Sequence, residues 1–329
     1  MTKGDTGLIG RGLAFCRAAG TRGAVDARDC RLPVSEIVNG ERLVVALVVA
    51  LGILVAPLAE AAGPGGWRPD EGSGSGAARS LEPEQNRVFE LTPTVGMRYH
   101  IWKEFDENGS KMLTESGPLF VVGVNPRLAF GEHKRFFVEA DLQLYLGKVV
   151  YDGLLQGPQQ ILIPYTSKTG YFGVEALPTA GYVFSLGRHL QLIPTAGLGF
   201  EYWNRDLDDG GAHGYDEKYE VLLVHAGVGG AYRVNRAVNV HLAVGLRMPV
   251  HISESVDLSR LDGPSGVGLS PGLSPRFVVK GGSRIHGVDV AAYFETWTLP
   301  RSSEVGGVLQ PESTRQIIGL QVGYALGVD

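Results

Sequence analysis

The sequence predicts an all-β protein: a transmembrane antiparallel up-and-down β-barrel of about ten strands, with short periplasmic turns and long extracellular loops. Three observations support this prediction. Apolar residues alternate with polar or small residues in segments that recur from residue 88 to residue 329. Most of these segments reach the roughly 9 to 11 residues that a tilted strand needs to cross a bilayer. The connections between them are alternately short and long.

The chain begins with a region that does not share this pattern. An apolar run at 43–58 ends at Ala59-Glu60-Ala61, which has the form of a signal-peptide cleavage site. An uncleaved membrane anchor is the alternative, but Gly52 and Pro57 interrupt the run. We therefore expect, in chain order, an N-terminal extension at 1–40 that a misplaced start codon would explain, a signal peptide at 41–61, a disordered linker rich in Gly, Pro and Ser at 62–87, and the barrel at 88–329.

Composition excludes several classes of function. The net charge is −5, and no stretch of the chain concentrates the basic residues that nucleic-acid binding requires. The only cysteines, Cys16 and Cys30, precede the barrel, so no disulfide or thiolate metal site is expected within it.

The first alternating segment illustrates the pattern. Val95, Met97 and Tyr99 form an apolar face, while Arg98 and His100 lie on the opposite face. The same alternation predicts strands through 89–101, 120–130, 136–146, 172–184, 190–202, 222–232, 238–250, 275–279, 288–296 and 318–326. Four prolines fall within these segments, and because proline cannot donate to the ladder we expect β-bulges there: Pro93, Pro126, Pro178 and Pro194.

The connections and the aromatic residues suggest an orientation. Short connections are expected at 131–135, 185–189, 235–236 and 281–284, and long ones at 103–117, 151–168, 204–217, 251–271 and 299–312. Aromatic residues cluster at one rim (Phe89, Phe130, Phe136, Phe184, Tyr232, Tyr324) and at the other (Tyr99, Phe172, Phe200, Tyr202). We interpret Trp102, Trp203 and Trp297, near the bases of the loops, as interfacial anchors.

On these segments, connections and aromatic rims, residues 88–329 resemble the small outer-membrane β-barrel proteins of Gram-negative bacteria. The resemblance implies an outer-membrane location reached by secretion, contact with outer-membrane lipid and lipopolysaccharide, and handling by periplasmic chaperones and the barrel-assembly machinery. The chain departs from the class in ending at Asp329 rather than at an aromatic residue. A soluble barrel with an apolar cavity is the structural alternative, because periodicity alone does not tell inside from outside.

If the apolar face meets lipid, the charged residues of the other face line the lumen. A lumen of about ten strands is narrow, so we expect these residues to fill it as a salt-bridge network, with a narrow solute or ion path as the alternative. The expected network is Arg98, His100, Glu139, Asp141, Glu175, Glu201, His225, Arg247, Lys280, Asp289 and Glu295.

One loop partly matches a calcium-binding pattern. Asp206, Asp208 and Glu217 occupy acidic positions of an EF-hand-like loop, with Gly211 at its sixth position. Gly210 replaces the third acidic ligand, and strands rather than helices flank the loop. A solvated acidic loop is the simpler interpretation.

The leading functional hypothesis is a structural or surface-binding protein that uses its long loops, since loops on a rigid scaffold usually carry recognition. A narrow channel for small solutes or ions is the alternative, and an outer-membrane hydrolase is the second alternative. We expect no enzymatic activity and no cofactor. Ten-stranded proteases of the omptin type carry paired aspartates near the outer rim, and this sequence has no D-x-D at an outer strand end. The sequence does not specify the extracellular ligand.

Overall fold

The computed structural model describes residues 88–131, 133–156, 162–208, 214–235, 237–261 and 263–328. The predicted extension, signal peptide and linker, at 1–40, 41–61 and 62–87, lie outside the described residues. No helix among the described residues is long and apolar enough to cross a membrane.

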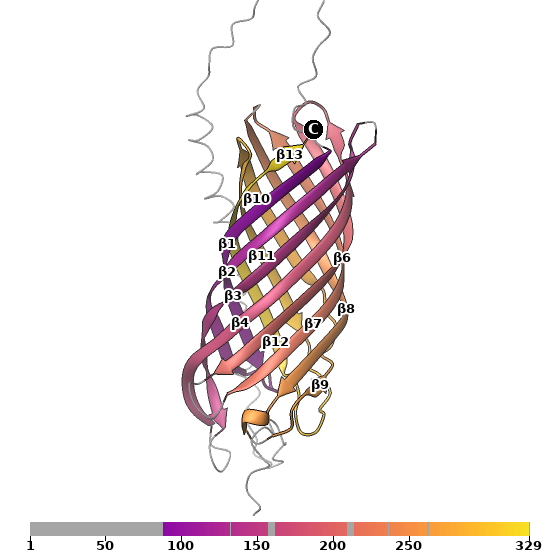
Figure 1. Ribbon diagram of the computed structural model, residues 1–329. Coiled ribbons are helices and arrows are strands. Elements are labelled where there is room, and N and C mark those ends of the chain that lie inside the picture. The colour runs from indigo at the N-terminus through magenta and orange to yellow at the C-terminus, as the bar shows by residue number, and fades with distance from the viewer. Residues whose placement is uncertain are drawn as a thin grey trace, which may run out of the picture.

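Ten long antiparallel strands form a closed barrel, which confirms the predicted fold class (Figure 1). They are β1 (Phe89–Phe105), β2 (Lys111–Phe130), β3 (Phe136–Gln156), β4 (Leu162–Tyr182), β6 (Leu190–Asp208), β7 (Tyr215–Arg233), β8 (Val238–Asp257), β10 (Arg276–Ile285), β11 (Val288–Leu299) and β12 (Glu312–Tyr324). Closure comes from pairing of β1 with β12 and of β8 with β10. Closing the sheet pairs backbone groups that an open edge would leave exposed to lipid.

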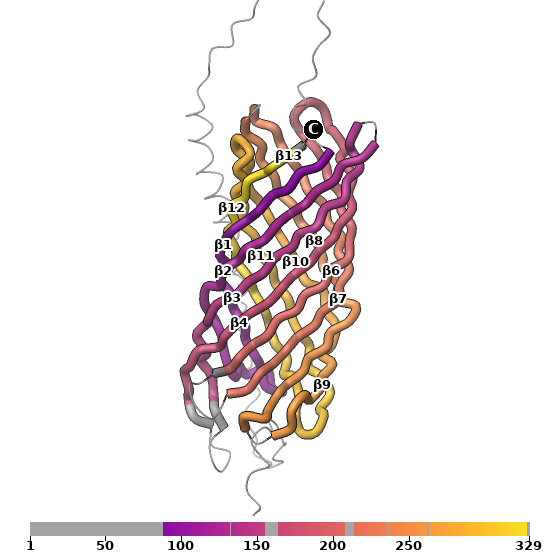
Figure 2. Tube along the Cα trace, in the orientation of Figure 1, coloured from indigo at the N-terminus to yellow at the C-terminus, as the bar shows by residue number. Residues whose placement is uncertain are grey.

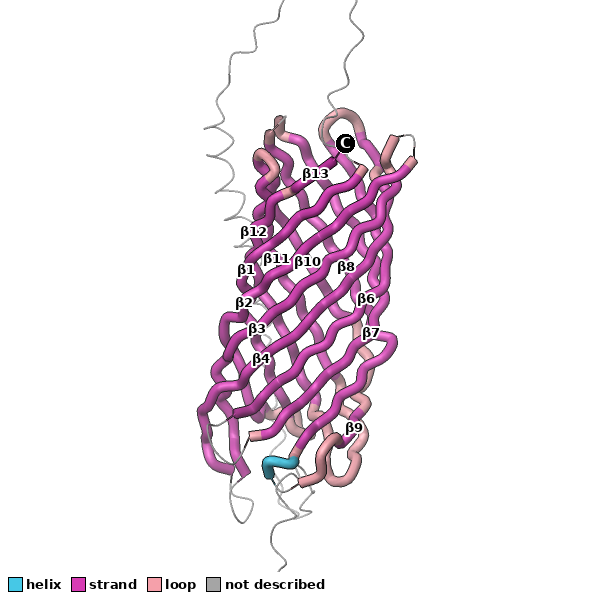
Figure 3. Tube along the Cα trace, viewed as in Figure 1, coloured by secondary structure: helices cyan, strands magenta, loops and turns pink. Residues whose placement is uncertain are grey.

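Short elements complete the two ends of the barrel. β5 (Phe184–Leu186) and β13 (Leu326–Val328) pair with β6 and β1, and β9 (Val267–Leu269) pairs with β8. The helical segment in Figure 3 is the short 3-10 helix η2 (Ser259–Leu261). The start of β1 and the end of the chain lie at the same end of the barrel, which we call the short-turn end (Figure 2). The opposite end is the long-loop end.

The strands continue well into the connections that the sequence analysis treated as loops. β1 and β2 are joined by residues 106–110 alone, so the long loop expected at 103–117 is wrong. The loops expected at 151–168 and 204–217 are likewise mostly strand, and the turn expected at 281–284 lies at 286–287. The strands extend further because backbone pairing continues where the apolar alternation of the outer face is interrupted by charged residues. Lys148 and Lys168, for example, are exposed on paired stretches of β3 and β4.

The apolar face of the wall points outward, as predicted. Val95 and Met97 are each 55% exposed, whereas the intervening Arg98 is 2% exposed. This arrangement excludes the soluble barrel with an apolar cavity. The aromatic rim at the short-turn end is also present, with all six of its residues on the outside: Phe89, Phe130, Phe136, Phe184, Tyr232 and Tyr324.

The prolines do not produce the expected bulges. β2 and β3 have the same register on either side of Pro126, although no pair forms at that residue. The same holds at Pro178 between β4 and β6. Proline therefore removes a ladder hydrogen bond without adding a residue. The register shifts that do occur lie at Glu104/Phe105 and Leu222/Leu223.

The wall is not equally tall all round. β2, β3, β4, β6, β7 and β8 each have 19 to 21 residues, whereas β10, β11 and β12 have 10, 12 and 13. The loop at 258–275 joins β8 to β10, and the loop at 300–311 joins β11 to β12. Both therefore lie at the long-loop end of the short strands, and both pack against β8. Leu258, Leu269 and Val308 from these loops form a buried cluster with Val256 of β8. The two loops thus cap the long-loop end.

Candidate functional site in the barrel lumen

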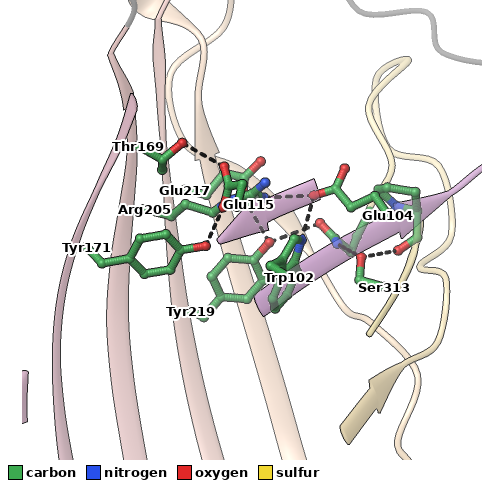
Figure 4. A network of polar contacts seen from close by, with 11 residues as sticks. Trp102, Glu104, Glu115, Thr169, Tyr171, Arg205, Glu217, Tyr219 and Ser313 are labelled. Carbon is green, nitrogen blue, oxygen red and sulfur yellow. Dashed lines mark hydrogen bonds and ion pairs between the residues drawn. The ribbon is translucent and has the colours of Figure 1, made fainter. Parts of the chain in front are cut away.

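The long-loop half of the lumen contains a cluster built around one arginine. Arg205 on β6 is fully buried and lies 2.8 Å from Glu104, 2.9 Å from Glu115 and 2.6 Å from Glu217. The three carboxylates come from β1, β2 and β7, so the cluster ties four strands together (Figure 4). The hydroxyl of Tyr171 donates to Glu115 at 2.5 Å. We call these residues the outer cluster.

A fourth carboxylate extends the outer cluster to the capping loops. Glu254 on β8 is 1% exposed. In the amide orientation that satisfies its neighbours, the Gln310 side-chain nitrogen donates to Glu254 at 2.9 Å. Tyr219 donates to Glu217 at 3.0 Å. The 300–311 loop is therefore held to the barrel wall by buried hydrogen bonds as well as by apolar packing.

The three tryptophans lie inside the barrel, and their interpretation as interfacial anchors is wrong. Trp102, Trp203 and Trp297 are at most 2% exposed. Trp203 stacks on Tyr219 with ring centres 4.6 Å apart, and Trp102 donates to Glu104 at 2.8 Å. Because the inner face carries large apolar residues here, the long-loop half of the lumen has a packed core of its own.

A second cluster lies deeper in the lumen. Glu201 on β6 pairs with Arg276 of β10 and with Arg315 of β12, the latter at 2.5 Å. Tyr145 donates to the same carboxylate at 3.1 Å. The Arg276 guanidinium also stacks on Trp297, with its central carbon 3.8 Å from the ring centre. Each of these ionic groups is buried, so the pairing offsets a desolvation cost of several kcal/mol per ion.

A third group follows toward the short-turn end. Arg247 on β8 lies 2.7 Å from Glu175 and 2.9 Å from Glu295. Glu295 also lies 3.6 Å from Arg276, so the second and third groups form one continuous network. We call this combined network the central cluster.

The short-turn half of the lumen is more open. Arg127 and Glu139 are 3.5 Å apart, with side chains 32% and 26% exposed. Arg284 lies 3.0 Å from Glu90 and 3.4 Å from Asp289, again with partly exposed side chains. The lumen is therefore accessible to solvent at the short-turn end. From the central cluster to the capping loops it is filled by side chains.

The structure places the predicted lumen residues on the inner face but does not join them in one network. Glu175, Arg247 and Glu295 contact one another. Glu201 binds arginines outside the predicted set, and Asp289 and Glu139 pair separately near the short-turn end. The remaining residues of the set are dispersed along the inner face. The His100 ring packs at a tilt against that of Tyr171, and His225 lies 3.5 Å from Thr195. Arg98, Asp141 and Lys280 line a cavity.

Sequence reasoning missed the residues that organise the clusters. Glu104, Glu115 and Arg205 fell in segments assigned to loops, and Arg315 preceded the last predicted strand. Extending the alternation would have found two of them, because Glu104 continues the inner face of Arg98 and His100, and Arg205 continues that of Glu201. Arg276 lay inside a predicted strand and was overlooked.

The calcium candidates are not brought together. Glu217 points into the lumen and binds Arg205, whereas Asp206 lies on the outside and accepts a hydrogen bond from Arg260 at 2.9 Å. Hydrogen bonds to Asp216 and Asp206 raise the pKa of the Arg260 guanidinium above its usual value. The side chain of Asp208 lies outside the described residues. Within the described part of the chain, no three His, Asp or Glu residues are arranged to hold a metal ion.

Neither the comparison with protein-family models nor that with curated proteins gives a match. Among solved structures, the chain is similar to the outer membrane protease OmpT from Escherichia coli, with a TM-score of 0.51 and 9% identity, covering 76% of this chain and 100% of that one. It is also similar to the translocator domain of the autotransporter NalP from Neisseria meningitidis, with a TM-score of 0.35 and 12% identity over 71% and 88% of the two chains.

A third similar structure is the COG4313 outer membrane channel from Pseudomonas putida F1, with a TM-score of 0.34 and 10% identity over 74% and 99% of the chains. At 9% identity, the likeness to OmpT shows the fold alone. The chain thus has the architecture of outer-membrane β-barrels, and fold by itself does not assign a function.

Proposed function

We propose that the protein is an exported outer-membrane barrel with a sealed lumen, which serves as a structural or surface-binding protein through its long-loop end. The observation that carries this proposal is the filling of the lumen. The outer and central clusters cross it in succession, and Arg205, Glu115, Arg276 and Glu201 are each at most 1% exposed. Within the described residues, two buried ionic layers and the aromatic packing between them fill the lumen, which favours a rigid platform over a pore.

The conducting alternative has one observation in its favour, the solvent-accessible short-turn half of the lumen. Planar-bilayer recording of the purified protein distinguishes the two functions. A sealed platform gives silent bilayers, and a variant carrying Arg276→Ala and Arg315→Ala should also stay silent, because the outer cluster still fills the long-loop half of the lumen. Steady unitary conductance of the unaltered protein would refute the platform.

We also propose that the barrel has no enzymatic activity. The carboxylates of the outer cluster, Glu104, Glu115, Glu217 and Glu254, are buried and paired or hydrogen-bonded, so none of these four is free to act on an external substrate. Incubating intact cells that display the protein with a broad set of peptide and ester substrates tests this. The control is the same cells lacking it, and cleavage dependent on the protein would overturn the proposal.

Lipopolysaccharide is the lipid partner that the outer surface fits best. Lys148, Lys168 and Lys218 are exposed on β3, β4 and β7, beyond the outward apolar residues Leu146, Phe172 and Leu222 of the same strands. Lysine side chains at this level reach the plane where lipid phosphates lie. Lipopolysaccharide should therefore raise the unfolding temperature of the barrel. The triple Lys→Ser variant should lose most of that rise, and an undiminished rise would exclude these lysines.

Membrane fractionation tests the proposed location and export, for which the apolar outer face and the A-x-A motif are the support. We expect the protein in the outer-membrane fraction with residues 1–61 removed. A tag placed in the 300–311 loop should be accessible on intact cells. A soluble periplasmic protein would refute the location.

A further inference from the structure

One cavity in the lumen is bordered by polar groups that have no partner. Its volume is about 40 Å³, which is room for a few water-sized occupants. It lies beside the central cluster, between β1, β3, β10, β11 and β12, and its lining includes Arg98, Lys280, Tyr293, Glu295 and Gln321.

The residues that line this cavity carry several buried atoms without a hydrogen-bond partner, and most of these atoms are donors. They are Nε and Nη2 of Arg98, Nε of Arg247, the hydroxyl of Tyr293 and Nε2 of Gln321. Among the fully buried acceptor atoms of these residues, Oε1 of Glu295 lacks a hydrogen bond, and it lies 3.6 Å from Arg276. Buried polar groups are nearly always satisfied, so a group of donors on one cavity indicates an occupant that accepts hydrogen bonds.

Arg98 gives the cavity a positive charge. Its guanidinium is 2% exposed and stacks on Tyr145, with its central carbon 3.1 Å from the ring centre. No carboxylate of the described residues lies within ion-pair distance of it. A buried guanidinium without a counter-ion is costly, whereas each of the other buried arginines has one.

The count of charges around the cavity also indicates a missing negative charge. The central cluster with Arg98 contains four guanidinium groups, Arg98, Arg247, Arg276 and Arg315, and three carboxylates, Glu175, Glu201 and Glu295. Asp141 and Lys280, the other ionisable residues on the lining, are partly exposed and cancel each other. One further negative charge would balance the central cluster taken by itself, whereas the outer cluster has three carboxylates around one guanidinium.

We propose that this cavity binds a small monovalent anion of halide size, held by Arg98 together with the Tyr293 hydroxyl and the Gln321 amide. A halide accepts hydrogen bonds from several directions and fits a cavity of this volume. The site is reached from the open short-turn half of the lumen and is closed on the other side by the central cluster.

Crystals of the full barrel grown in bromide provide the first test, because bromide scatters anomalously and water does not. An anomalous peak within hydrogen-bonding distance of the Arg98 guanidinium and the Tyr293 hydroxyl is expected. Density without an anomalous signal would mean water alone and would overturn the proposal.

Thermal unfolding provides the second test, in bromide and in gluconate at equal ionic strength. The unaltered barrel should unfold about 2–4 °C higher in bromide, the shift that roughly four-fifths occupancy gives in a domain of this size. Arg98→Gln should abolish the difference. Arg127→Gln is the matched control, because Arg127 also stacks on an inward aromatic ring, Phe137, but lies outside the cavity. Equal shifts in all three proteins would overturn the site, and if Arg98→Gln does not fold, the bromide crystals decide.

Discussion

The substitution Arg205→Met tests whether the outer cluster holds the long-loop end together. It leaves Glu104, Glu115 and Glu217 buried without their cation. With about 4 Å between charge centres, each attraction amounts to about 4 kcal/mol at an effective dielectric constant near 20. Most of this offsets desolvation, and removal of one partner from a buried network costs about 3–5 kcal/mol net. We expect a loss of that size in the free energy of unfolding.

Urea unfolding of the barrel in lipid vesicles, followed by tryptophan fluorescence, measures this loss. Trp102 reports on the site directly, since the Arg205 guanidinium carbon lies 5.3 Å from its ring centre. Arg260→Met is the matched control. Arg260 also binds two carboxylates, Asp206 and Asp216, but its side chain is 40% exposed, so its loss should cost less than about 1 kcal/mol.

The direction of the pH effect adds a second criterion. Protonation neutralises the abandoned carboxylates, so the deficit of Arg205→Met should shrink as the pH falls. A deficit within about 1 kcal/mol of that of Arg260→Met would refute the view that buried ion pairing secures this end.

Three further predictions concern the wall and the cap. In Gly173→Ala the added methyl would lie 2.2 Å from the Tyr145 ring, so we expect a loss of about 1–3 kcal/mol in urea unfolding, against little change for Gly230→Ala, where the nearest atom is 3.8 Å away. Leu198 is 64% exposed on the outer face, and Leu198→Arg should cost about 2–4 kcal/mol in lipid, while Lys218→Arg should be neutral; equal effects would contradict the assignment of the lipid face. Gln310→Leu leaves Glu254 without its amide donor and should speed proteolysis within 300–311, with cleavage unchanged in Gln316→Leu.

The sequence was sufficient for the wall of the barrel but not for its interior. Alternation over Val95, Met97 and Tyr99 identifies an outward apolar face because lipid selects apolar side chains at every second position. Beyond Ile101 the outer face carries Lys103, which interrupts the apolar alternation, although the same strand continues to Phe105. The strand ends, and with them Glu104 and Glu115, were therefore misplaced.

The pairing of charges across the lumen lies beyond what one sequence can provide. Glu201 meets Arg315, which is 114 residues away, and Arg205 meets Glu104 at a separation of 101. These partners are set by the tilt and stagger of the closed sheet, which alternation does not reveal. Alternation from Glu201 to Arg205 places Trp203 on the inner face, but it does not reveal that its partner is the ring of Tyr219 on the neighbouring strand.

The seam between β1 and β12 imposes an order on biogenesis. Residue 94 pairs with residue 323, so the first strand waits for nearly the whole chain before its free edge is covered. Until then the sheet has two edge strands with unpaired backbone N–H and C=O groups, and each edge can pair with a strand of another chain. A truncation that removes β12 would leave the edges of β1 and β11 unpaired, and we expect such a variant to aggregate instead of closing into a smaller barrel.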